Sequence, residues 1–481
     1  MPMPTDRREG GMNVIAEVKT PQLTKLHAGK VRDSFRIDAE RRLIVVTDRI
    51  SAFDLRLSTP VPQKGEVLNR LAAFWFSATR DVVPNHLLEA VSEQASLVRE
   101  ATPVRVEMIV RGYMAGSMAR GYAAGKREFS GASVAAGLEE NARLPSPIVT
   151  PTTKEDSDRE ITPDDLVREG LASRALYDKM ASVSLELFRR GSEVLRAKGL
   201  VLADTKYEFG LVGDDLVLID EIHTPDSSRI WDAAAYARSP KDVPPLDKEL
   251  VRAFMLKERE RTGAFPLALP ASVVEETRAR YVELFRRVTG QEPSGAHDPL
   301  ARLYEALVAG GHIKPGFVVV CMGSPSDVEH AKRVRKVLAN YGVRTFVRVV
   351  SAHKNGERIQ ELAESYNGAL EPGAVVAIAG ESNGLGGALA ANLELPLVNA
   401  PPYGDKSDLI LNLQSSLMMP SNIPATTAIR PENAALAALR SLNLRHLKAR
   451  FSGEIHEMKA RLIRADDAMQ SELGADDEAT T

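Results

Sequence analysis

The chain has 481 residues, of which 44% are hydrophobic and 26% charged, the balance of a globular protein too long for one typical core. Its 62 Lys and Arg stand against 65 Asp and Glu, and a net charge of -3 gives no basic surplus for binding nucleic acid. No window approaches 18 uncharged apolar residues and the start lacks a signal peptide, so we expect a cytoplasmic protein without membrane contact. The single cysteine, Cys321, predicts a buried thiol in a reducing compartment.

The first part of the chain predicts an α+β domain over residues 15–290. Short β-branched strands flanked by turn residues are predicted within 41–50, 103–113 and 215–222. Apolar residues spaced three and four apart predict a helix over 173–199, which ends at a glycine, and a second helix over 272–290.

Residues 290–299 are rich in Gly, Pro, Ser and Asp. They separate the α+β pattern before them from a regular alternation of strands and helices after them. We therefore expect a linker and connecting helix over 291–314. Apolar strands then alternate with helices, which predicts a three-layer α/β domain with a parallel sheet over 315–475. Its last helix, 445–472, is amphipathic and either packs on another subunit or covers its own domain.

Polar clusters follow the first three strands of this second domain, as "GSPSD" (323–327), "SAHK" (351–354) and "ESNGLGG" (381–387). Ligands of parallel sheets bind at the carboxyl ends of the strands, so we expect these loops to form one crevice. His353 offers a proton carrier near neutral pH, and Lys354 offers a fixed positive charge. The glycines of the third loop allow close approach of backbone to a ligand.

The first of these loops has two interpretations. Backbone N–H groups and the hydroxyls of Ser324 and Ser326 are suited to holding a phosphate at a helix N-terminus. Taken alone, Ser326 or Asp327 is more simply a helix cap.

Over roughly 315–440, four motifs resemble, in order and spacing, the aminoimidazole ribonucleotide (AIR) carboxylase family of purine biosynthesis. The motifs are "GSPSD", "SAHK", "AGESNGLGG" and "SSLMMPSNIPATT". A mutase branch of that family typically has SAHR and a GAAHLPG loop. Lys354 and "SNGLG" instead resemble the branch that takes up carbon dioxide directly, without ATP. The alternatives for this domain are a mutase that rearranges N5-CAIR, an N-carboxylated ribonucleotide, or a non-catalytic oligomerisation module.

The resemblance implies roles for the three loops. Lys354 would stabilise the developing carboxylate, His353 would carry the ring proton, and Ser382 would bind the carboxylate. It implies no metal or cofactor for the carboxylase, and a homo-oligomer, which in this family is an octamer. The remaining residues expected to bind AIR or CAIR are Ser324, Ser326, Asp327, Ser351 and Gly384.

In the first domain, Gly29 and Lys30 lie between candidate strands, close to Arg32, in a hairpin suited to covering nucleotide phosphates. A second candidate site lies in 203–232. If this segment turns at 213–215, Glu208 faces Asp220, and two carboxylates directly opposite each other are destabilising unless a cation such as magnesium lies between them. The alternative is two solvated carboxylates in another register.

Further motifs resemble the SAICAR synthetase family over about 20–290: "GKVRD", "VVTDRISAFD", "QKGEVLN", "VEMIVRGYMAGS", "DTKYEFG" and "DEIHTPDSSRIWD". This resemblance implies an ATP-dependent ligase fold. Magnesium would be held by Glu208 and Asp220, and ATP by Gly29, Lys30 and Arg32. The residues implied to bind CAIR are Arg111, Ser117, Asp204, Lys206, Asp226 and Arg229.

The two resemblances support each other chemically. The C-terminal domain would convert AIR and CO2 to CAIR, the ribonucleotide carboxylated on its ring. The N-terminal domain would phosphorylate the CAIR carboxylate with ATP, and the amine of L-aspartate would displace the phosphate to give SAICAR. The product of one domain is thus the substrate of the other.

Overall fold

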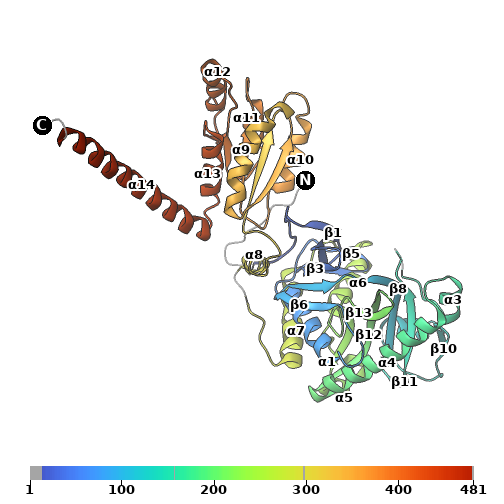
Figure 1. Ribbon diagram of the computed structural model, residues 1–481. Helices are drawn as coiled ribbons and strands as arrows, with labels where there is room; N and C mark the ends of the chain where they lie inside the picture. The colour runs from blue at the N-terminus through green and yellow to red at the C-terminus, as the bar shows by residue number, and fades with distance from the viewer. Residues whose placement is uncertain (1–12, 156–157, 296–297, 479–481) are drawn as a thin grey trace. The chain divides into compact units, whose positions relative to one another are not determined.

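The computed structural model describes residues 13–155, 158–295 and 298–478 (Figure 1). The chain forms two compact units, one of Met1–Val18 with Leu23–Gly310 and one of Lys19–Gln22 with Gly311–Thr481. In the described ranges, no helix combines the length and the apolar character needed to span a bilayer.

The first unit contains two five-stranded sheets, in agreement with the predicted α+β class. The first sheet has the order β1 (Thr24–Ala28), β2 (Arg32–Arg36), β3 (Arg41–Val46), β7 (Ala95–Arg99) and β6 (Leu87–Ser92). In the second, β11 (Arg143–Thr153), β8 (Thr102–Tyr113), β12 (Leu200–Val212) and β13 (Asp215–Ile219) are neighbours, and β14 (Ser228–Asp232) also pairs with β12. Short strand pairs are β4 (Ser51–Ala52) with β5 (Leu55–Arg56), and β9 (Glu128–Phe129) with β10 (Ala132–Ser133).

Helices of this unit bury apolar faces against the sheets. The long ones are α1 (Lys64–Ala78), α4 (Arg174–Ala197), α6 (Glu249–Thr262) and α7 (Ala271–Thr289), and the short ones α2 (Gly116–Ala123), α3 (Pro163–Arg168), α5 (Ala233–Arg238), α8 (Pro299–Ala309) and the 3₁₀ turn η1 (Pro240–Asp242). One core contains Trp75 of α1, Leu187 of α4, Phe285 of α7 and Met108 of β8. The helix predicted over 173–199 forms as α4 because Ser173 caps it, its hydroxyl accepting a hydrogen bond from the N–H of Leu176 at 3.2 Å.

The hairpin of β12 and β13 corrects the predicted register by one residue. Val212 pairs with Asp215, so the turn has two residues, and Glu208 pairs with Ile219 and not with Asp220. Gly213 has φ of +60° and stands at the first central position, where a type II′ turn needs a glycine. The predicted three-residue turn was therefore wrong.

The second unit is built on a parallel five-stranded sheet, in agreement with the predicted α/β class. Its order is β16 (Arg344–Val349), β15 (Phe317–Met322), β17 (Gly373–Ile378), β18 (Leu397–Asn399) and β19 (Thr426–Thr427). The helices are α9 (Val328–Leu338), α10 (Glu357–Tyr366), α11 (Gly384–Ala390), α12 (Lys406–Leu417), α13 (Pro431–Ser441) and α14 (Arg445–Glu478), with 3₁₀ turns η2 (Pro325–Asp327) and η3 (Ala339–Tyr341).

Alternate residues of the central strand face two different cores. Val318 and Val320 pack with side chains of α9 and α13, whereas Val319 and Cys321 pack with side chains of α10 and α11. The sheet is thus the middle layer of three. Cys321 is buried as predicted, and burial raises the pKa of its thiol to about 12.

A short segment from the beginning of the chain, Lys19–Gln22, belongs to this second unit. The N–H of Leu370 donates to the carbonyl of Lys19 at 2.8 Å, and the Thr20 hydroxyl donates to the buried carboxylate of Glu371. Gln22 exchanges two hydrogen bonds with the backbone of Lys314, of 2.8 and 2.9 Å. The segment therefore completes the packing before β17.

Candidate functional site

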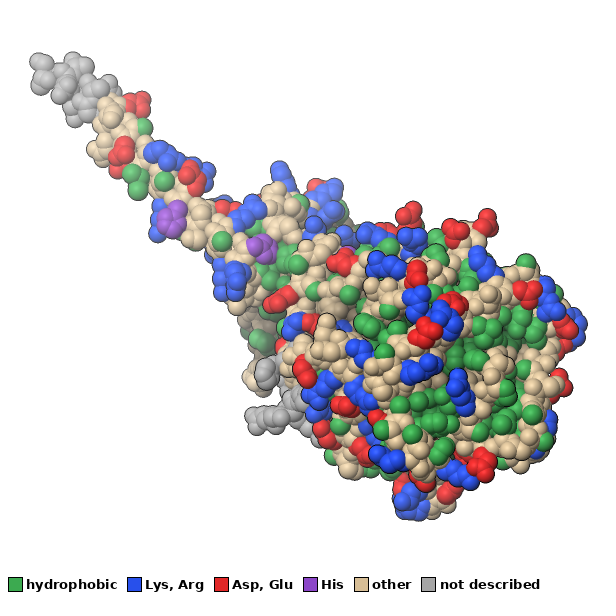
Figure 2. Space-filling model, turned by 90° about the horizontal axis from the view of Figure 1, so that it is seen from below, with side chains coloured by type: hydrophobic (Ala, Val, Ile, Leu, Met, Phe, Trp, Pro, Cys, Tyr) green, Lys and Arg blue, Asp and Glu red, His purple; other side chains and the backbone are tan. Residues whose placement is uncertain are grey.

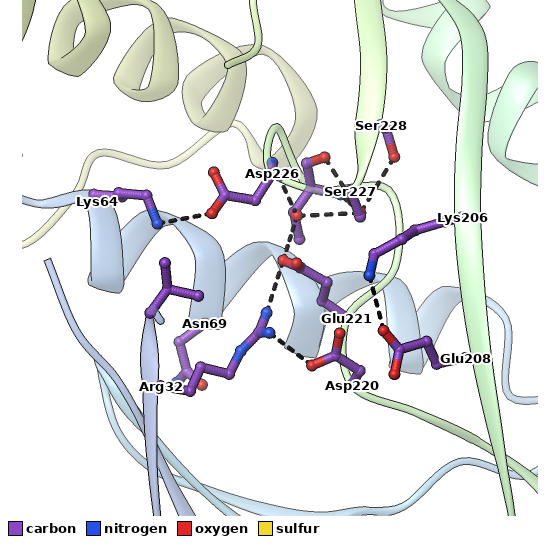
Figure 3. Close-up of polar contacts among 12 residues, drawn as sticks. Arg32, Lys64, Asn69, Lys206, Glu208, Asp220, Glu221, Asp226, Ser227 and Ser228 are labelled. Atoms are coloured by element: carbon purple, nitrogen blue, oxygen red, sulfur yellow. Dashed lines mark hydrogen bonds and ion pairs between the residues drawn. The ribbon is translucent and has the colours of Figure 1, made fainter. Parts of the chain in front are cut away.

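Glu208 lies in a group of alternating charges on β8 and β12. The Lys206 ammonium is 2.8 Å from Glu208 (Figure 3) and 2.7 Å from Glu107, and the Lys154 ammonium contacts the other Glu208 oxygen. Burial alone would lower the pKa of Lys206, but the carboxylates of Glu107 and Asp220 outweigh burial and raise it. Both carboxylate oxygens of Glu208 are thus held by cations.

Asp220 joins the same group from the end of β13. Its carboxylate is 2.6 Å from one guanidinium nitrogen of Arg32, and another nitrogen of Arg32 is 2.9 Å from Glu221 (Figure 3). Asp220 has φ of +67°, so the alternation of the strand ends at this residue. Burial raises the pKa of the Asp220 carboxyl, but Arg32, Lys206 and Lys154 lower it more.

These carboxylates suit a magnesium ion that completes its shell with ligand oxygens. Among the residues the structure describes, three or more His, Cys, Asp or Glu side chains nowhere gather as a metal site. Magnesium commonly takes one or two carboxylates and fills the rest of its octahedron with phosphate and water oxygens. Glu208 and Asp220 can supply such a pair. In this structure Lys154 and Lys206 neutralise the charge of Glu208, and Arg32 that of Asp220.

The hairpin of β1 and β2 carries the residues predicted to bind ATP. Lys30 lies in its exposed loop with its ammonium 2.6 Å from Asp54, and the N–H of Gly29 donates to the carbonyl of Arg32 at 2.7 Å. A small cavity begins beside Arg32 and Asp220. Its lining also includes Leu68, Asn69, Phe76 and His86. Of the residues predicted to bind ATP, Arg32 thus lines this cavity.

A second cluster joins four of the residues predicted to bind CAIR. Asp204 of β12 lies directly opposite Arg111 of β8 and Arg229 of β14. Its carboxylate is 3.3 Å from Arg111 and 2.6 Å from Arg229, and Arg111 also donates to the Ser117 hydroxyl at 3.3 Å. Gly116 has φ of +59°, which favours glycine, and a Cβ there would stand 2.6 Å from the Arg229 guanidinium and displace it. Two fixed guanidiniums and a hydroxyl are donors suited to a carboxylate or phosphate.

Asp226 lies away from the surface, in a buried group that the sequence did not predict. Its carboxylate is 2.8 Å from the ammonium of Lys64, 2.7 Å from the hydroxyl of Tyr281 and 3.7 Å from the ammonium of Lys248. Burial raises the pKa of Asp226, but Lys248 and Lys64 outweigh it and hold the pKa well below its usual range. Burial lowers the pKa of Lys248 to about 8. Lys64 is the second residue of the motif "QKGEVLN", and Asp226 lies in the motif "DEIHTPDSSRIWD".

In the second unit, the loops after β16 and β17 meet at His353. Its Nε2 is 3.5 Å from the hydroxyl of Ser382, and a Cβ on Gly384 would stand 2.8 Å from Cε1 of the imidazole. His353 and Lys354 are both exposed, and within the described ranges Lys354 forms no ion pair. Ser351 is half-buried, and its N–H donates to the Asn355 side chain at 2.7 Å.

The loop after β15 lies beside the loop after β17, because a Cβ on Gly323 would be 3.3 Å from the Ala379 Cβ. Ser324 caps the following 3₁₀ turn, accepting from the N–H of Ser326 at 3.3 Å and from its hydroxyl at 2.7 Å. Asp327 starts α9 without a side-chain capping bond, and burial raises the pKa of its carboxyl. Asp327 thus has the N-cap position of α9, as one interpretation predicted, but the side-chain cap in this loop is that of Ser324 on the 3₁₀ turn.

Two protein families match the two parts of the chain. SAICAR synthetase matches residues 25–264, and AIR carboxylase matches residues 317–462. A phosphoribosylaminoimidazole-succinocarboxamide synthase of Cytophaga hutchinsonii is 42% identical over 289 residues, which cover 58% of this chain and 93% of that protein. A protein of the same name from Legionella pneumophila is 38% identical over 278 residues, covering 56% and 88%.

A solved SAICAR synthase from Saccharomyces cerevisiae, complexed with SAICAR, has a similar fold with a TM-score of 0.52. It is 31% identical, and the match covers 58% of this chain and 99% of that one. The synthetase match and the carboxylase match occupy separate parts of one polypeptide. The chain belongs to the SAICAR synthetase family and carries a domain of the AIR carboxylase family after it.

Proposed function

We propose that the chain catalyses two consecutive steps of purine biosynthesis. Its C-terminal unit would carboxylate AIR with CO2 to CAIR, and its N-terminal unit would ligate CAIR to L-aspartate with ATP, giving SAICAR, ADP and phosphate. The observation that carries this proposal is the presence, in one chain, of two family matches whose reactions share CAIR.

For the carboxylation, the C-terminal loops supply charge and a proton carrier. C4 of the aminoimidazole ring attacks CO2 and forms a carbon–carbon bond, after which the ring proton must leave. Lys354, exposed and without an ion pair among the described residues, would stabilise the new carboxylate. His353, held between Ser382 and Gly384, would accept the ring proton. The ribose phosphate would bind at Ser324 and Ser326, and this unit would need no cofactor.

For the ligation, the N-terminal clusters would position two substrates. The guanidiniums of Arg111 and Arg229 would hold anionic groups of CAIR, and Lys30 and Arg32 the phosphates of ATP. The CAIR carboxylate attacks the γ-phosphorus, ADP leaves, and the aspartate amine then displaces phosphate from the acyl phosphate. Magnesium at Glu208 and Asp220 would supply charge neutralisation during phosphoryl transfer. Asp226 would fix the position of Lys64 without touching the ligand.

We further propose a cytoplasmic homo-oligomer, in keeping with the octamers of the carboxylase family. Two other roles of the C-terminal unit give different results in the same assay. A mutase would use N5-CAIR and ignore CO2, whereas a non-catalytic module would use neither.

The test is an assay of the full chain with AIR and bicarbonate, omitting ATP and aspartate in turn. The proposal expects CAIR without ATP, and SAICAR only when both co-substrates are present. Lys354→Ala should abolish CAIR formation but leave SAICAR synthesis from supplied CAIR intact. An absence of CAIR with bicarbonate, combined with turnover of N5-CAIR, would overturn the carboxylase proposal in favour of the mutase.

A further inference from the structure

Helix α14 exposes an apolar stripe along most of its length. Its first turns are anchored, with Leu447 and Phe451 buried and the Phe451 ring 5.5 Å from that of Tyr341. From residue 452 to 473, every side chain is exposed except the half-buried Ala460. The stripe continues the spacing of the anchored residues through Ile455, Met458, Leu462, Ala465 and Met469.

These steps of four and three residues are those of a coiled-coil seam. Leu462 is 67% exposed and Met469 is 60% exposed, and Leu473, also exposed, lies beside the row. Figure 2 shows hydrophobic side chains exposed on the helix that extends from the second unit. Exposed apolar side chains in a contiguous row mark an interaction surface. The AIR carboxylase match ends at residue 462, so the later part of this helix lies outside the matched region.

The charges of α14 are segregated between its two halves. Residues 445–464 contain six Lys and Arg and two Glu, a net charge of +4, whereas residues 465–478 contain six Asp and Glu and no Lys or Arg, a net charge of -6. A parallel pair of such helices would place like charges side by side, which is unfavourable. An antiparallel pair places each basic half against an acidic half.

We propose that α14 pairs with α14 of a second copy of this chain, antiparallel, through the seam from Met458 to Met469. A pair centred between residues 463 and 464 stacks Leu462 on Ala465 and Met458 on Met469 of the other copy. The same register brings Lys459 next to Asp466 of the other copy on one flank of the seam, so the seam and the charges select one alignment. The contact is isologous and closes on two copies.

Spin-label distances on the full-length protein test the alignment. Cys321 is buried and inert, so single labels at Ala460→Cys and Gly453→Cys, both on the side of α14 away from the seam, are specific. In an antiparallel pair the axial separation of equal residues grows by about 3 Å per residue from the centre, giving about 10 Å for position 460 and about 30 Å for position 453. A parallel pair gives equal distances at both positions and overturns the proposal.

Charge variants provide the second readout. In the Ala460→Cys background, Lys459→Glu and Asp466→Lys should each reduce the fraction of spins at the short distance several-fold, and the two together should restore it. Leu462→Glu should abolish that distance. The proposal is overturned if these variants leave the spin–spin distance unchanged. It is also overturned if the label at position 460 shows no second spin nearby, because α14 would then not contact a second α14.

Discussion

Lys64 and Asp226 form an ion pair of 2.8 Å in which the lysine side chain is 0% and the aspartate side chain 4% exposed. The pair joins the beginning of α1 to the loop between β13 and β14, next to the loop residues Asp220 and Glu221 (Figure 3). A buried charge without a partner is costly, so each residue of this pair depends on the other. The pair therefore fixes the loop that carries Asp220.

We predict that Asp226→Asn lowers the free energy of unfolding of the first unit by about 3–5 kcal/mol, because Lys64 keeps its charge in a buried place. Both tryptophans, Trp75 and Trp231, lie in this unit, so their fluorescence during urea unfolding reports on it alone. The control is Asp214→Asn in the exposed turn after β12, which should leave the midpoint unchanged. The double variant Lys64→Met, Asp226→Leu should regain part of the stability. If the double variant stays as unstable as the single one, packing and not charge causes the loss.

For the second unit, we predict that Gly384→Ala lowers the rate of carboxylation by about 100-fold, because the new Cβ would stand 2.8 Å from the His353 imidazole and displace it. SAICAR formation from supplied CAIR should not change. Gly387→Ala, in the same helix, is the matched control, since its Cβ would meet only the Met419 sulfur, at 3.4 Å. Equal loss in both variants would point to disruption of α11 and not to His353.

For the proposed metal site, we predict that Glu208→Gln raises the magnesium concentration for half-maximal SAICAR synthesis by about 10-fold or more, because one of two carboxylate ligands is lost. Chelation with EDTA should stop SAICAR synthesis and leave CAIR formation unchanged. Asp215→Asn, on the neighbouring strand and exposed, is the control. An unchanged magnesium dependence in Glu208→Gln would remove Glu208 from the metal site.

The buried imidazole of His223 predicts loss of stability in acid. Its Nε2 is 2.7 Å from the Tyr207 hydroxyl, and burial lowers its pKa from 6.5 to about 3. Below pH 6.5 the imidazole of His223 is protonated in the unfolded chain but stays neutral in the folded chain. This contribution to stability is therefore complete above pH 6.5 and falls by about 2 kcal/mol between pH 7 and pH 5.

A comparison of urea unfolding at pH 7 and pH 5 measures this difference, again by tryptophan fluorescence. His223→Gln should show a pH dependence smaller than that of the unaltered protein by about 2 kcal/mol. His27→Gln, an exposed histidine of β1, should match the unaltered protein. The same pH dependence in all three proteins would mean that His223 does not stay neutral in the folded state.

Much of the fold follows from local patterns, and the exceptions have physical causes. The strands of the second unit are continuous apolar runs because both of their faces are covered, and this pattern is legible in the sequence. The register of β12 and β13 was missed because a turn of two or three residues depends on the backbone angles of Gly213. The sequence does not distinguish a turn of Gly213 and Asp214 from one that also includes Asp215, because glycine and aspartate suit both turns.

The candidate sites were predictable where family motifs named the residues, and less so where burial decides the contacts. Asp204, Arg111 and Arg229 come from three separate motifs and are brought together by strand register. Lys64 and Lys248 were missed because a lysine reads as a surface residue until tertiary packing encloses it. The capping role of Ser324 was missed because Ser326 and Asp327 are equally suitable cap residues on chemical grounds.

Because of the segment Lys19–Gln22, dividing the polypeptide at one position cannot give two complete units. The polypeptide passes from one unit to the other after Val18, returns after Gln22, and passes over again after Gly310. A C-terminal fragment starting at residue 311 would lack this segment, which forms hydrogen bonds with Glu371 and Lys314. Engineered separation of the two activities would therefore require grafting this peptide onto the fragment, or a circular permutation that keeps it attached.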